Sequence, residues 1–373
     1  MAIRIVPHSA ELRDPVHRFN MRMREGGSRW GFYTEPVPTW IPPRVGTPVW
    51  REYHIAVDDQ GYVRGGYALK PQPWVIRGEQ RTVSDWQGPF SEGAISDRYA
   101  VLGIRMVRDM LRKQPLLFSW GHGGHEQPVV QMLRRMRWLL HDTPFCLLIC
   151  HPRRFLRHNR LLRGSPGRAL ALDALAFSGA GSLGLRALHA AQRARHPRRF
   201  RAHASEVPRF GPWADILWET HRDKYLALAV RDATVMNTLL PEGDWPRGIR
   251  LRVTRGGRDL GWAVVMDTQM QNDERFGHLR VGSVVDCFAD PDDAGEVAHA
   301  ATHFLRVRGV DLIMSNQAHP RWARGFAENG YIVLQKRRIF AASPALREAL
   351  EPLEETLQGL HLTNMDGHGP MTL

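Results

Sequence analysis

Residues able to transfer protons gather in two short stretches in the first half of the chain. The stretch SWGHGGHEQP carries His122, His125 and Glu126 among three glycines, and Glu92 follows an apolar run that ends at Phe90. A histidine titrates near neutral pH, and one beside a carboxylate can deprotonate an amine or a hydroxyl group. We therefore predict His122, His125 and Glu92 as catalytic residues, with a structural role as the alternative for each.

Metal and thiol chemistry have less support in the sequence. A metal site built on His122 and His125 would need a third ligand, and the spacing of the other histidines, cysteines and carboxylates supplies none, so we predict no metal. The three cysteines cannot form a disulfide framework, which is typical of a reducing compartment. Cys287, which follows Asp286, is an alternative nucleophile.

The elements that would position such residues are clearest between residues 279 and 333. β-branched residues before Asp290 predict a strand, an apolar set at helical spacing predicts a helix that ends before Gly309, and a short apolar run predicts a second strand. A helix that begins at Pro320 and a strand from Tyr331 complete a β-α-β-α-β order. This order predicts a layered α/β domain with ligands at the strand ends.

Elements of the same type recur earlier in the chain, at an offset of roughly 195 residues. Hairpins over 53–69 and 249–266 each precede a strand, a loop, a helix, a second strand and a further helix. We therefore predict two copies of one α/β domain, each with an α+β mixed sheet. The predicted boundaries are 1–152 for the first domain, 153–209 for an arginine- and alanine-rich linker, 210–342 for the second domain, and 343–373 for a C-terminal helix and tail.

Several motifs give this repeat a family resemblance. Asn316, Ala323 and the Gly330-Tyr331 pair resemble the closing motif of the GNAT acyltransferase fold. A tandem GNAT architecture is similar to that of mycothiol synthase, N-myristoyltransferase and the FemAB/FemX aminoacyl-transferases. The stretches GPFSEGAISDRYAVLG, QPLLFSWGHGGHEQPVVQMLRRMRW and LHLTNMDGHGP also resemble bacterial tandem GNAT-like proteins associated with cell-surface polysaccharide gene clusters.

The resemblance implies a place for coenzyme A (CoA). GNAT proteins bind its pyrophosphate where the fourth strand turns into the next helix, because a helix N-terminus supplies free N–H donors and a positive dipole end. In the first copy this place is held by residues 93–103, which depart from the family's R/Q-x-x-G-x-G/A loop. The predicted cofactor-binding residues are Gly93, Ser96, Arg98, Tyr99 and Gly103. A loop that only caps the helix is the alternative.

The second copy has a different loop at the equivalent place. Residues 289–296 hold four carboxylates, and each would repel a diphosphate by about 1–4 kcal/mol at a contact of ~4 Å. We therefore expect acetyl-CoA or another acyl-CoA in the first copy, whereas analogy with mycothiol synthase favours the second. Ser315, Asn316 and His319 mark a strand end of the second copy and are the predicted substrate-binding residues, with helix capping as the alternative.

Charge and hydropathy limit the possible partners and locations. The formal net charge of +13 indicates an anionic partner, and the basic segment 153–209 could contact an anionic membrane, contact RNA, or serve as a solvated linker. No apolar run approaches the ~20 residues of a membrane span, and the first residues lack the apolar core of a signal peptide. We expect a cytoplasmic protein, with peripheral contact at the inner membrane as an alternative.

Together these features predict an acyl-CoA-dependent N- or O-acyltransferase of the GNAT type. The expected acceptor is a small amine, such as an amino sugar or a similar cell-envelope precursor. Two alternatives stay open: an aminoacyl-tRNA-dependent, FemX-like transferase with tRNA as its partner, and a non-catalytic GNAT-fold binding or scaffold protein. For the C-terminal region we predict a single helix over Ala345–Leu357, followed by a flexible tail.

Overall fold

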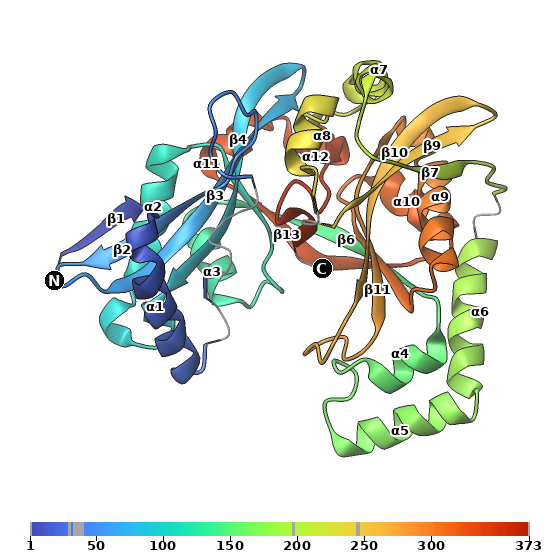
Figure 1. Ribbon diagram of the computed structural model, residues 1–373, viewed down its shortest axis with the longest axis horizontal. Helices are drawn as coiled ribbons and strands as arrows, with labels where there is room; N and C mark the ends of the chain where they lie inside the picture. The colour runs from blue at the N-terminus through green and yellow to red at the C-terminus, as the bar shows by residue number, and fades with distance from the viewer. Residues whose placement is uncertain (1, 29–30, 33–40, 196–197, 244–246, 372–373) are drawn as a thin grey trace. The chain divides into compact units, whose positions relative to one another are not determined.

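The computed structural model of the chain describes residues 2–28, 31–32, 41–195, 198–243 and 247–371 (Figure 1). Within these ranges it is a mixed α/β structure of strands with helices packed on them.

Contacts divide the chain into two compact units. Unit 1 comprises residues 1–141 and 339–353, and unit 2 comprises residues 142–338 and 354–373. The chain therefore enters unit 2 within one strand, returns to unit 1 within another, and ends in unit 2.

Unit 1 contains a mixed sheet in the order β1-β2-β3-β4-β5-β13, in which only β4 and β5 run parallel. Its elements, in chain order, are β1 Ile3–Pro7, α1 Arg13–Glu25, β2 Glu52–Asp58, β3 Val63–Ile76, β4 Glu79–Ser91, α2 Leu102–Lys113, β5 Leu117–Gly121 and α3 Pro128–Arg135, to which the end of β13 (Ile332–Ala342) and α11 (Pro344–Ala349) are added. The long β3–β4 hairpin forms because both strands carry apolar residues on their inward positions.

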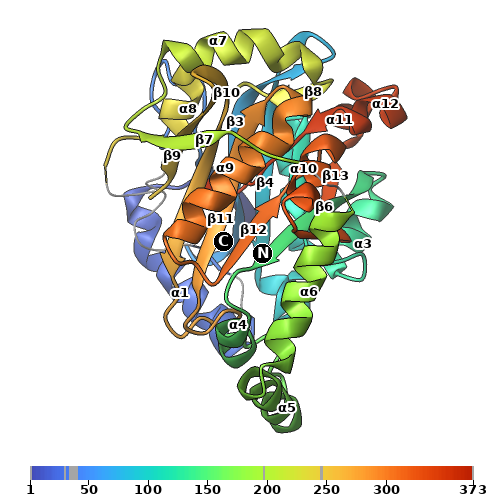
Figure 2. The ribbon, with the colours of Figure 1, turned by 90° about the vertical axis from the view of Figure 1, so that its right-hand side faces the viewer.

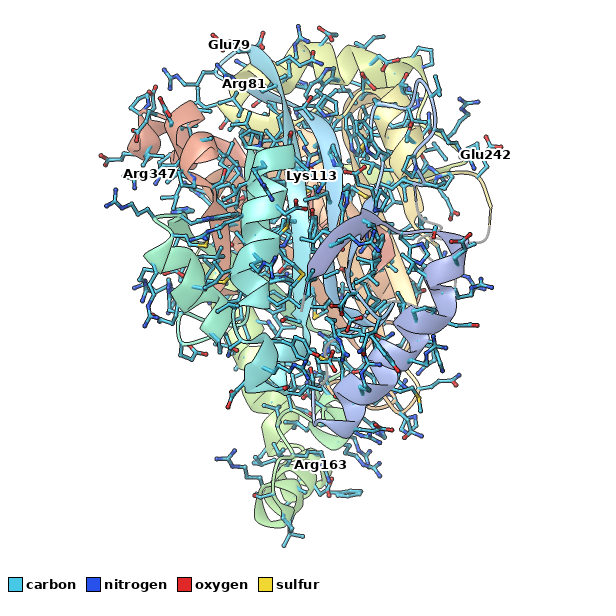
Figure 3. All side chains as sticks on the ribbon, turned by 90° about the vertical axis from the view of Figure 1, so that its left-hand side faces the viewer. Glu79, Arg81, Lys113, Arg163, Glu242 and Arg347 are labelled. Atoms are coloured by element: carbon cyan, nitrogen blue, oxygen red, sulfur yellow. The ribbon has the colours of Figure 1, made fainter. Side chains whose placement is uncertain are left out.

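Helices pack on this sheet through two separate apolar clusters. One cluster joins α2 and α3 to the sheet around Trp86 and Trp138, and the other joins α1 to the strands around Phe19 and Phe32. The hydroxyl of Tyr67 also ties α2 to β3, because it donates a hydrogen bond to Asp109 Oδ2 at 2.5 Å. Lys113, one turn further along α2, binds the same carboxylate (Figure 3).

Within unit 2 the strands lie in the order β6-β12-β11-β10-β9-β7 of a mixed sheet, and of these neighbouring pairs only β11 and β12 run parallel. Its elements are β6 Leu139–Ile149, α4 Pro152–His158, α5 Pro166–Phe177, α6 Ala180–Ala194, β7 His203–Val207, α7 Pro212–His221, β8 Ala227–Ala229, α8 Ala233–Leu239, β9 Ile249–Arg255, β10 Arg258–Gln269, β11 Arg280–Ala289, α9 Ala294–Val307, β12 Leu312–Asn316, α10 Pro320–Glu328, the first part of β13, α12 Leu353–Gln358 and β14 Leu360–His361.

The order of elements repeats between the units as the sequence predicts. β5 begins at Leu117 and β12 at Leu312, so equivalent strands lie 195 residues apart. In both units a long strand, a helix and a parallel strand follow a hairpin, which makes the fold a tandem repeat of one α/β domain.

The structure corrects two expectations about the C-terminal region. The predicted single helix is two short helices, because Pro352 interrupts the backbone hydrogen bonds between α11 and α12. The tail is not flexible over residues 360–366, all of which are buried in unit 2.

The segment 153–209, expected to be a linker, contains α4, α5 and α6 and belongs to unit 2.

Candidate functional site

The loop that leads into α2 brings together two of the predicted cofactor-binding residues. After β4 the chain makes two 3₁₀ turns, Glu92–Ala94 and Asp97–Tyr99, before α2 begins. Gly93 packs so tightly that an added Cβ would lie 2.4 Å from the carbonyl oxygen of Tyr99. Only glycine fits this position, so Gly93 is required for the loop's shape.

The remaining predicted residues of this loop lie around the start of α2. The carbonyl of Ser96 accepts a hydrogen bond from the backbone N–H of Tyr99 at 3.0 Å, and the exposed Arg98 places its guanidinium 5.8 Å from the Tyr99 ring. Gly103 lies in the first turn of α2, near Pro89 of β4. No side chain of a described residue caps this helix, so its first N–H groups are suited to bind an anion.

The carboxylate of Glu92 is buried between two arginines of unit 1. Arg22 Nε donates to Oε1 at 3.1 Å, and Arg64 Nη1 donates to Oε2 at 3.0 Å. Arg64 also binds Asp58 at 2.8 Å, so α1, β2, β3 and the first 3₁₀ turn are linked through one cluster of charges. These contacts favour a structural role for Glu92; its predicted catalytic role stays a prediction.

The parallel strands of unit 1 pair over a short length only. Ser84 and Asp85 of β4 pair with Leu117 and Phe118 of β5, and both strands continue beyond this pairing. We call the continuing segments, residues 86–91 and 119–122, the unit 1 splay. Within β4 the pairing with β3 also shifts, which leaves Gly88 and Pro89 as a bulge. Residues 88–91 are half-buried, so this part of β4 remains accessible.

His122 stands at the end of β5, at the edge of the unit 1 splay. Its Nε2 lies 2.8 Å from the hydroxyl oxygen of Ser119, and its ring lies 6.2 Å from that of Trp86. Its φ of 66° is a left-handed conformation, which is uncommon for a residue other than glycine and often marks a functional site. The structure thus gives His122 an ordered hydrogen-bond partner, as a proton-transferring group requires.

His125 lies in the following loop and has different surroundings. Its Nδ1 accepts a hydrogen bond from Arg134 Nη2 at 3.1 Å, and its backbone carbonyl accepts one from Gln131 at 2.6 Å. Among the described residues, no group of three or more histidines, cysteines, aspartates or glutamates is arranged to hold a metal.

The equivalent segments of unit 2 are β11 beyond Val284 and the chain beyond Ser315, where the pairing of β11 with β12 ends. We call residues 285–289 and 316–319 the unit 2 splay. β11 has a bulge at Val285, which is nearly the equivalent position in the repeat to the bulge of β4 in unit 1. Here, however, every residue of both segments is buried.

The C-terminal tail fills the unit 2 splay. On one side, Met365 N–H donates to the Val285 carbonyl at 2.9 Å, and His361 Nε2 donates to the Cys287 carbonyl at 2.8 Å. On the other side, Ala318 N–H donates to the carbonyl of Leu362 at 3.1 Å. The tail therefore takes the place of a strand between the two diverging segments.

A buried charge cluster holds the tail in place. The guanidinium of Arg231 donates to Asp286 Oδ1 at 3.1 Å and to Asp366 Oδ2 at 2.6 Å, and all three side chains are at most 3% exposed. Thr363 Oγ1 donates to Asp286 at 2.7 Å, and the Thr363 N–H donates to Asp366 at 2.7 Å. The two carboxylates share this one cation, and the Thr363 hydroxyl and N–H groups supply them with further hydrogen bonds.

The predicted substrate-binding residues of unit 2 have separate environments. Ser315 Oγ is buried and donates to the Val284 carbonyl at 3.0 Å, and Asn316 is 7% exposed within β12. His319 caps α10, because its Nδ1 accepts from the Arg321 N–H at 3.2 Å. Burial, followed by the charge of Arg321, lowers the pKa of His319 to about 4, so this ring is neutral near neutral pH.

Two charged hollows lie at the starts of α9 and α10. One, of about 250 Å³, is lined by Arg198, Arg324 and Glu328, and the other, of about 400 Å³, by Lys224 and His319. Both include Pro291, Asp292 and Arg321.

The carboxylates of residues 289–296 have partners within unit 2. Asp292 lies 3.4 Å from Arg321, and Asp293 lies 3.4 Å from Arg255. Glu296 binds Arg255 and two backbone N–H groups. Cys287, the alternative nucleophile, is fully buried, and its pKa is raised well above the usual range by burial and then by Asp286. A thiol in this environment is not reactive.

Sequence reasoning missed two residues that the structure makes important. Ser119 lies inside an apolar strand, where nothing in the local pattern marks it as the partner of His122. Arg231 precedes a short helix, and its role depends on Asp366, which lies 135 residues away in the sequence.

The fold is the tandem GNAT fold. No protein-family model and no curated protein matches the sequence, but solved structures match over most of the chain. Saccharomyces cerevisiae N-myristoyltransferase with bound myristoyl-CoA, itself a tandem GNAT fold, matches with a TM-score of 0.54 and 9% identity over 92% of this chain and 79% of its own.

Two bacterial structures show the same fold. A conserved protein of unknown function from Enterococcus faecalis V583, described as a probable N-acyltransferase, matches with a TM-score of 0.50 and 9% identity over 94% of this chain and 75% of its own. A GCN5-related N-acetyltransferase from Anabaena variabilis matches with a TM-score of 0.50 and 11% identity over 91% of this chain and 72% of its own. At these identities the likeness shows the fold alone.

Proposed function

We propose that this chain is an acyl-CoA-dependent N- or O-acyltransferase whose thioester substrate binds in the unit 1 splay. The observation that carries the proposal is the contrast between the two splays: residues 88–91 of β4 are accessible, whereas residues 285–289 of β11 are covered by the tail. The fold similarity supports it, because proteins of this fold include an N-myristoyltransferase with bound myristoyl-CoA and an N-acetyltransferase.

The residues around the unit 1 splay suit the two ends of an acyl-CoA molecule. The uncapped start of α2 offers N–H donors and a positive dipole end for phosphate groups, and the exposed Arg98 adds a cation. The bulge at Gly88 leaves that residue outside the pairing register with β3, where its N–H could stabilise the oxyanion of an attacked thioester.

His122 is the group that we propose as the base. Its ring nitrogen would take the proton from the acceptor's amine or hydroxyl as that group attacks the thioester carbonyl, and the carbon–sulfur bond then breaks to release CoA. Ser119 acts as a positioning residue, because its hydroxyl lies 2.8 Å from Nε2 and fixes the ring orientation. The proposed acceptor, an amino sugar or a similar cell-envelope precursor, rests on the sequence resemblance alone.

Thermal unfolding with and without acyl-CoA tests the proposal. A ligand that binds only the native state stabilises it by about 2.7 kcal/mol at a concentration of about 100 times its dissociation constant. We expect acetyl-CoA or myristoyl-CoA to raise the melting temperature of the purified chain.

Two charge reversals then locate the site. Arg98→Glu should reduce the ligand-induced shift, because Arg98 lies at the start of α2. Arg321→Glu, a matched change at the start of α10 in unit 2, should leave it intact. The proposal fails if no thioester raises the melting temperature, or if only Arg321→Glu removes the shift.

A further inference from the structure

The positive charge of the chain is concentrated in one part of unit 2. Residues 152–195, which we call the arm, contain nine arginines and one acidic residue, Asp173, a net charge of +8 against +13 for the whole chain. The arm comprises α4, α5 and α6, and α5 lies at its outer end (Figure 2).

The arm is an ordered structure that is anchored on one side. On α6, His189 Nδ1 donates to the Gly330 carbonyl at 2.8 Å, and its Nε2 accepts from the Ile149 N–H at 3.2 Å. Apolar residues of α4 and α5, among them Leu156 and Ala176, pack in a cluster with strands β6, β11 and β12. These contacts fix α4 and the inner faces of α5 and α6.

The arm exposes large apolar residues. Half of the large apolar side chains that the described residues expose, seven of fourteen, belong to this segment. They are Leu161, Leu162, Leu170, Leu175, Phe177, Leu183 and Leu188. Leu170 is 74% exposed, Leu183 is 69% exposed and Phe177 is 63% exposed. Single exposed apolar side chains are common on protein surfaces, whereas several in one segment indicate an interaction site.

Arginines lie beside these apolar side chains. The guanidinium groups of Arg153 and Arg157 lie 5.3 Å and 5.0 Å from the ring of Phe177. Arg163 pairs with Asp173 at 2.7 Å and thereby neutralises the only carboxylate of the arm. Arg168 and Arg186 form no ion pair with any residue that the structure describes. The surface therefore combines apolar side chains with uncompensated positive charge.

We propose that the arm docks on the surface of an anionic lipid bilayer. Its exposed leucines and Phe177 would enter the boundary between headgroups and acyl chains, while its arginines bind lipid phosphates. The proposed contact is peripheral. Among the described residues, no helix is long and apolar enough to cross a bilayer.

Charge complementarity selects this partner over two others. Two copies of the arm would each bring a net charge of +8 to a shared interface, so repulsion opposes self-association. A nucleic acid would match the charge, but bases stack on aromatic rings, and among the exposed apolar side chains of the arm only Phe177 offers one. An anionic bilayer matches both the charge and the aliphatic side chains.

Sedimentation of the full chain with vesicles tests the proposal without any acyl-CoA. We expect binding to an equimolar mixture of phosphatidylcholine and phosphatidylglycerol, weakened by salt, and little binding to phosphatidylcholine alone. Arg168→Gln combined with Arg186→Gln should weaken binding by about 25-fold, since each cation near an anionic surface contributes about fivefold. Leu170→Ser combined with Phe177→Ser should weaken it by at least about tenfold.

Matched changes outside the arm serve as controls. Arg4→Gln with Arg347→Gln removes two exposed arginines, and Ile216→Ser with Val307→Ser removes two exposed apolar side chains; both pairs should leave binding unchanged. Because all of these residues are exposed, the melting temperature of every variant should equal that of the parent.

Three results would overturn the proposal. The first is equal binding to neutral and anionic vesicles, and the second is an equal loss of binding in the control variants. The third is a concentration-dependent dimer, or binding to RNA, that the arm substitutions abolish while vesicle binding persists. Each is independent of whether acyl-CoA binds in unit 1.

Discussion

The two units build the same splayed strands and then use them differently. In unit 1, β4 and β5 diverge beyond Asp85 and Phe118, and residues 88–91 remain accessible. In unit 2, β11 and β12 diverge beyond Val284 and Ser315, and the C-terminal tail occupies the space with backbone hydrogen bonds on both sides. One copy of the repeat thus leaves this part of its strands accessible, and the other copy covers the equivalent part with its own chain.

The charged clusters beside the two splays also differ in their burial. The tail of unit 2 is held by Arg231, Asp286 and Asp366, all at most 3% exposed. In unit 1 the cluster of Glu92 with Arg22 and Arg64 lies at the edge of the splay, and the side chain of Arg22 is 29% exposed. The ion pairs of unit 2 therefore stabilise its core, whereas those of unit 1 hold a loop beside an accessible strand.

The largest expected effect follows from removing the cation that holds the tail. Arg231→Met leaves Asp286 and Asp366 buried without their cation, and we expect the free energy of unfolding to fall by about 3–5 kcal/mol. Urea unfolding followed by far-ultraviolet circular dichroism measures this loss. Arg22→Met is the matched change in unit 1 and should cost only about 1 kcal/mol, because Glu92 keeps Arg64. Equal losses of unfolding free energy in the two variants would contradict the different roles assigned to the two charged clusters.

The second effect concerns the proposed base. His122→Asn keeps a residue type that tolerates the left-handed backbone, and it should lower the rate of acyl transfer about 10²-fold while binding of acyl-CoA persists. Release of free CoA measures the rate. The same change at His125 should have a smaller effect, because the Nδ1 of that ring already accepts a hydrogen bond from Arg134 of α3. A larger loss at His125 would transfer the role of base to that residue.

A third prediction separates the two glycines that lead into α2. Gly93→Ala would place a Cβ against the Tyr99 carbonyl, so we expect a loss of about 1–3 kcal/mol in unfolding free energy. Gly103→Ala meets nothing closer than Pro89, at 3.8 Å, and should be tolerated within the helix. If both substitutions are neutral in a thermal melt, the loop does not depend on its tight turn.

The smallest effect concerns the dependence of unit 2 on pH. The pKa of His319 is lowered to about 4, so the unfolded chain binds more protons than the native state between about pH 6.5 and about pH 4. Stability is therefore full above about pH 6.5 and falls as the pH drops, by about 1 kcal/mol from this histidine at about pH 5.5. His319→Asn can still cap α10 but does not titrate, so the pH slope of its unfolding free energy should be shallower. An unchanged slope would exclude His319 as a contributor.

Much of the fold follows from local patterns in the sequence. Apolar periodicity predicted the repeated order of strands and helices, and the offset between β5 and β12 agrees with the prediction. The sequence did not predict that β6 and β13 each begin in one unit and end in the other. The apolar runs of these strands carry no local signal for the strands with which they pair. The burial of the tail was missed for the same reason, since Arg231 and Asp366 meet across 135 residues.

The candidate site was predictable where glycine marks an unusual backbone. The three glycines around His122 indicated a strand end with room for a ligand, and Gly93 proved to be required by a close backbone contact. Ser119 gave no such signal, because a small polar residue within an apolar strand is common in protein cores. The acidic loop of unit 2 misled the charge argument in one respect: its carboxylates have arginine and backbone partners.

The most direct test of the account is amide hydrogen exchange with and without acyl-CoA. If the thioester binds in the unit 1 splay, amides of residues 88–104 should gain protection, and those of residues 285–296 and 360–366 should not change. Protection of residues 285–296, with faster exchange in residues 360–366, would mean that the ligand displaces the tail and that unit 2 is the acyl-binding copy.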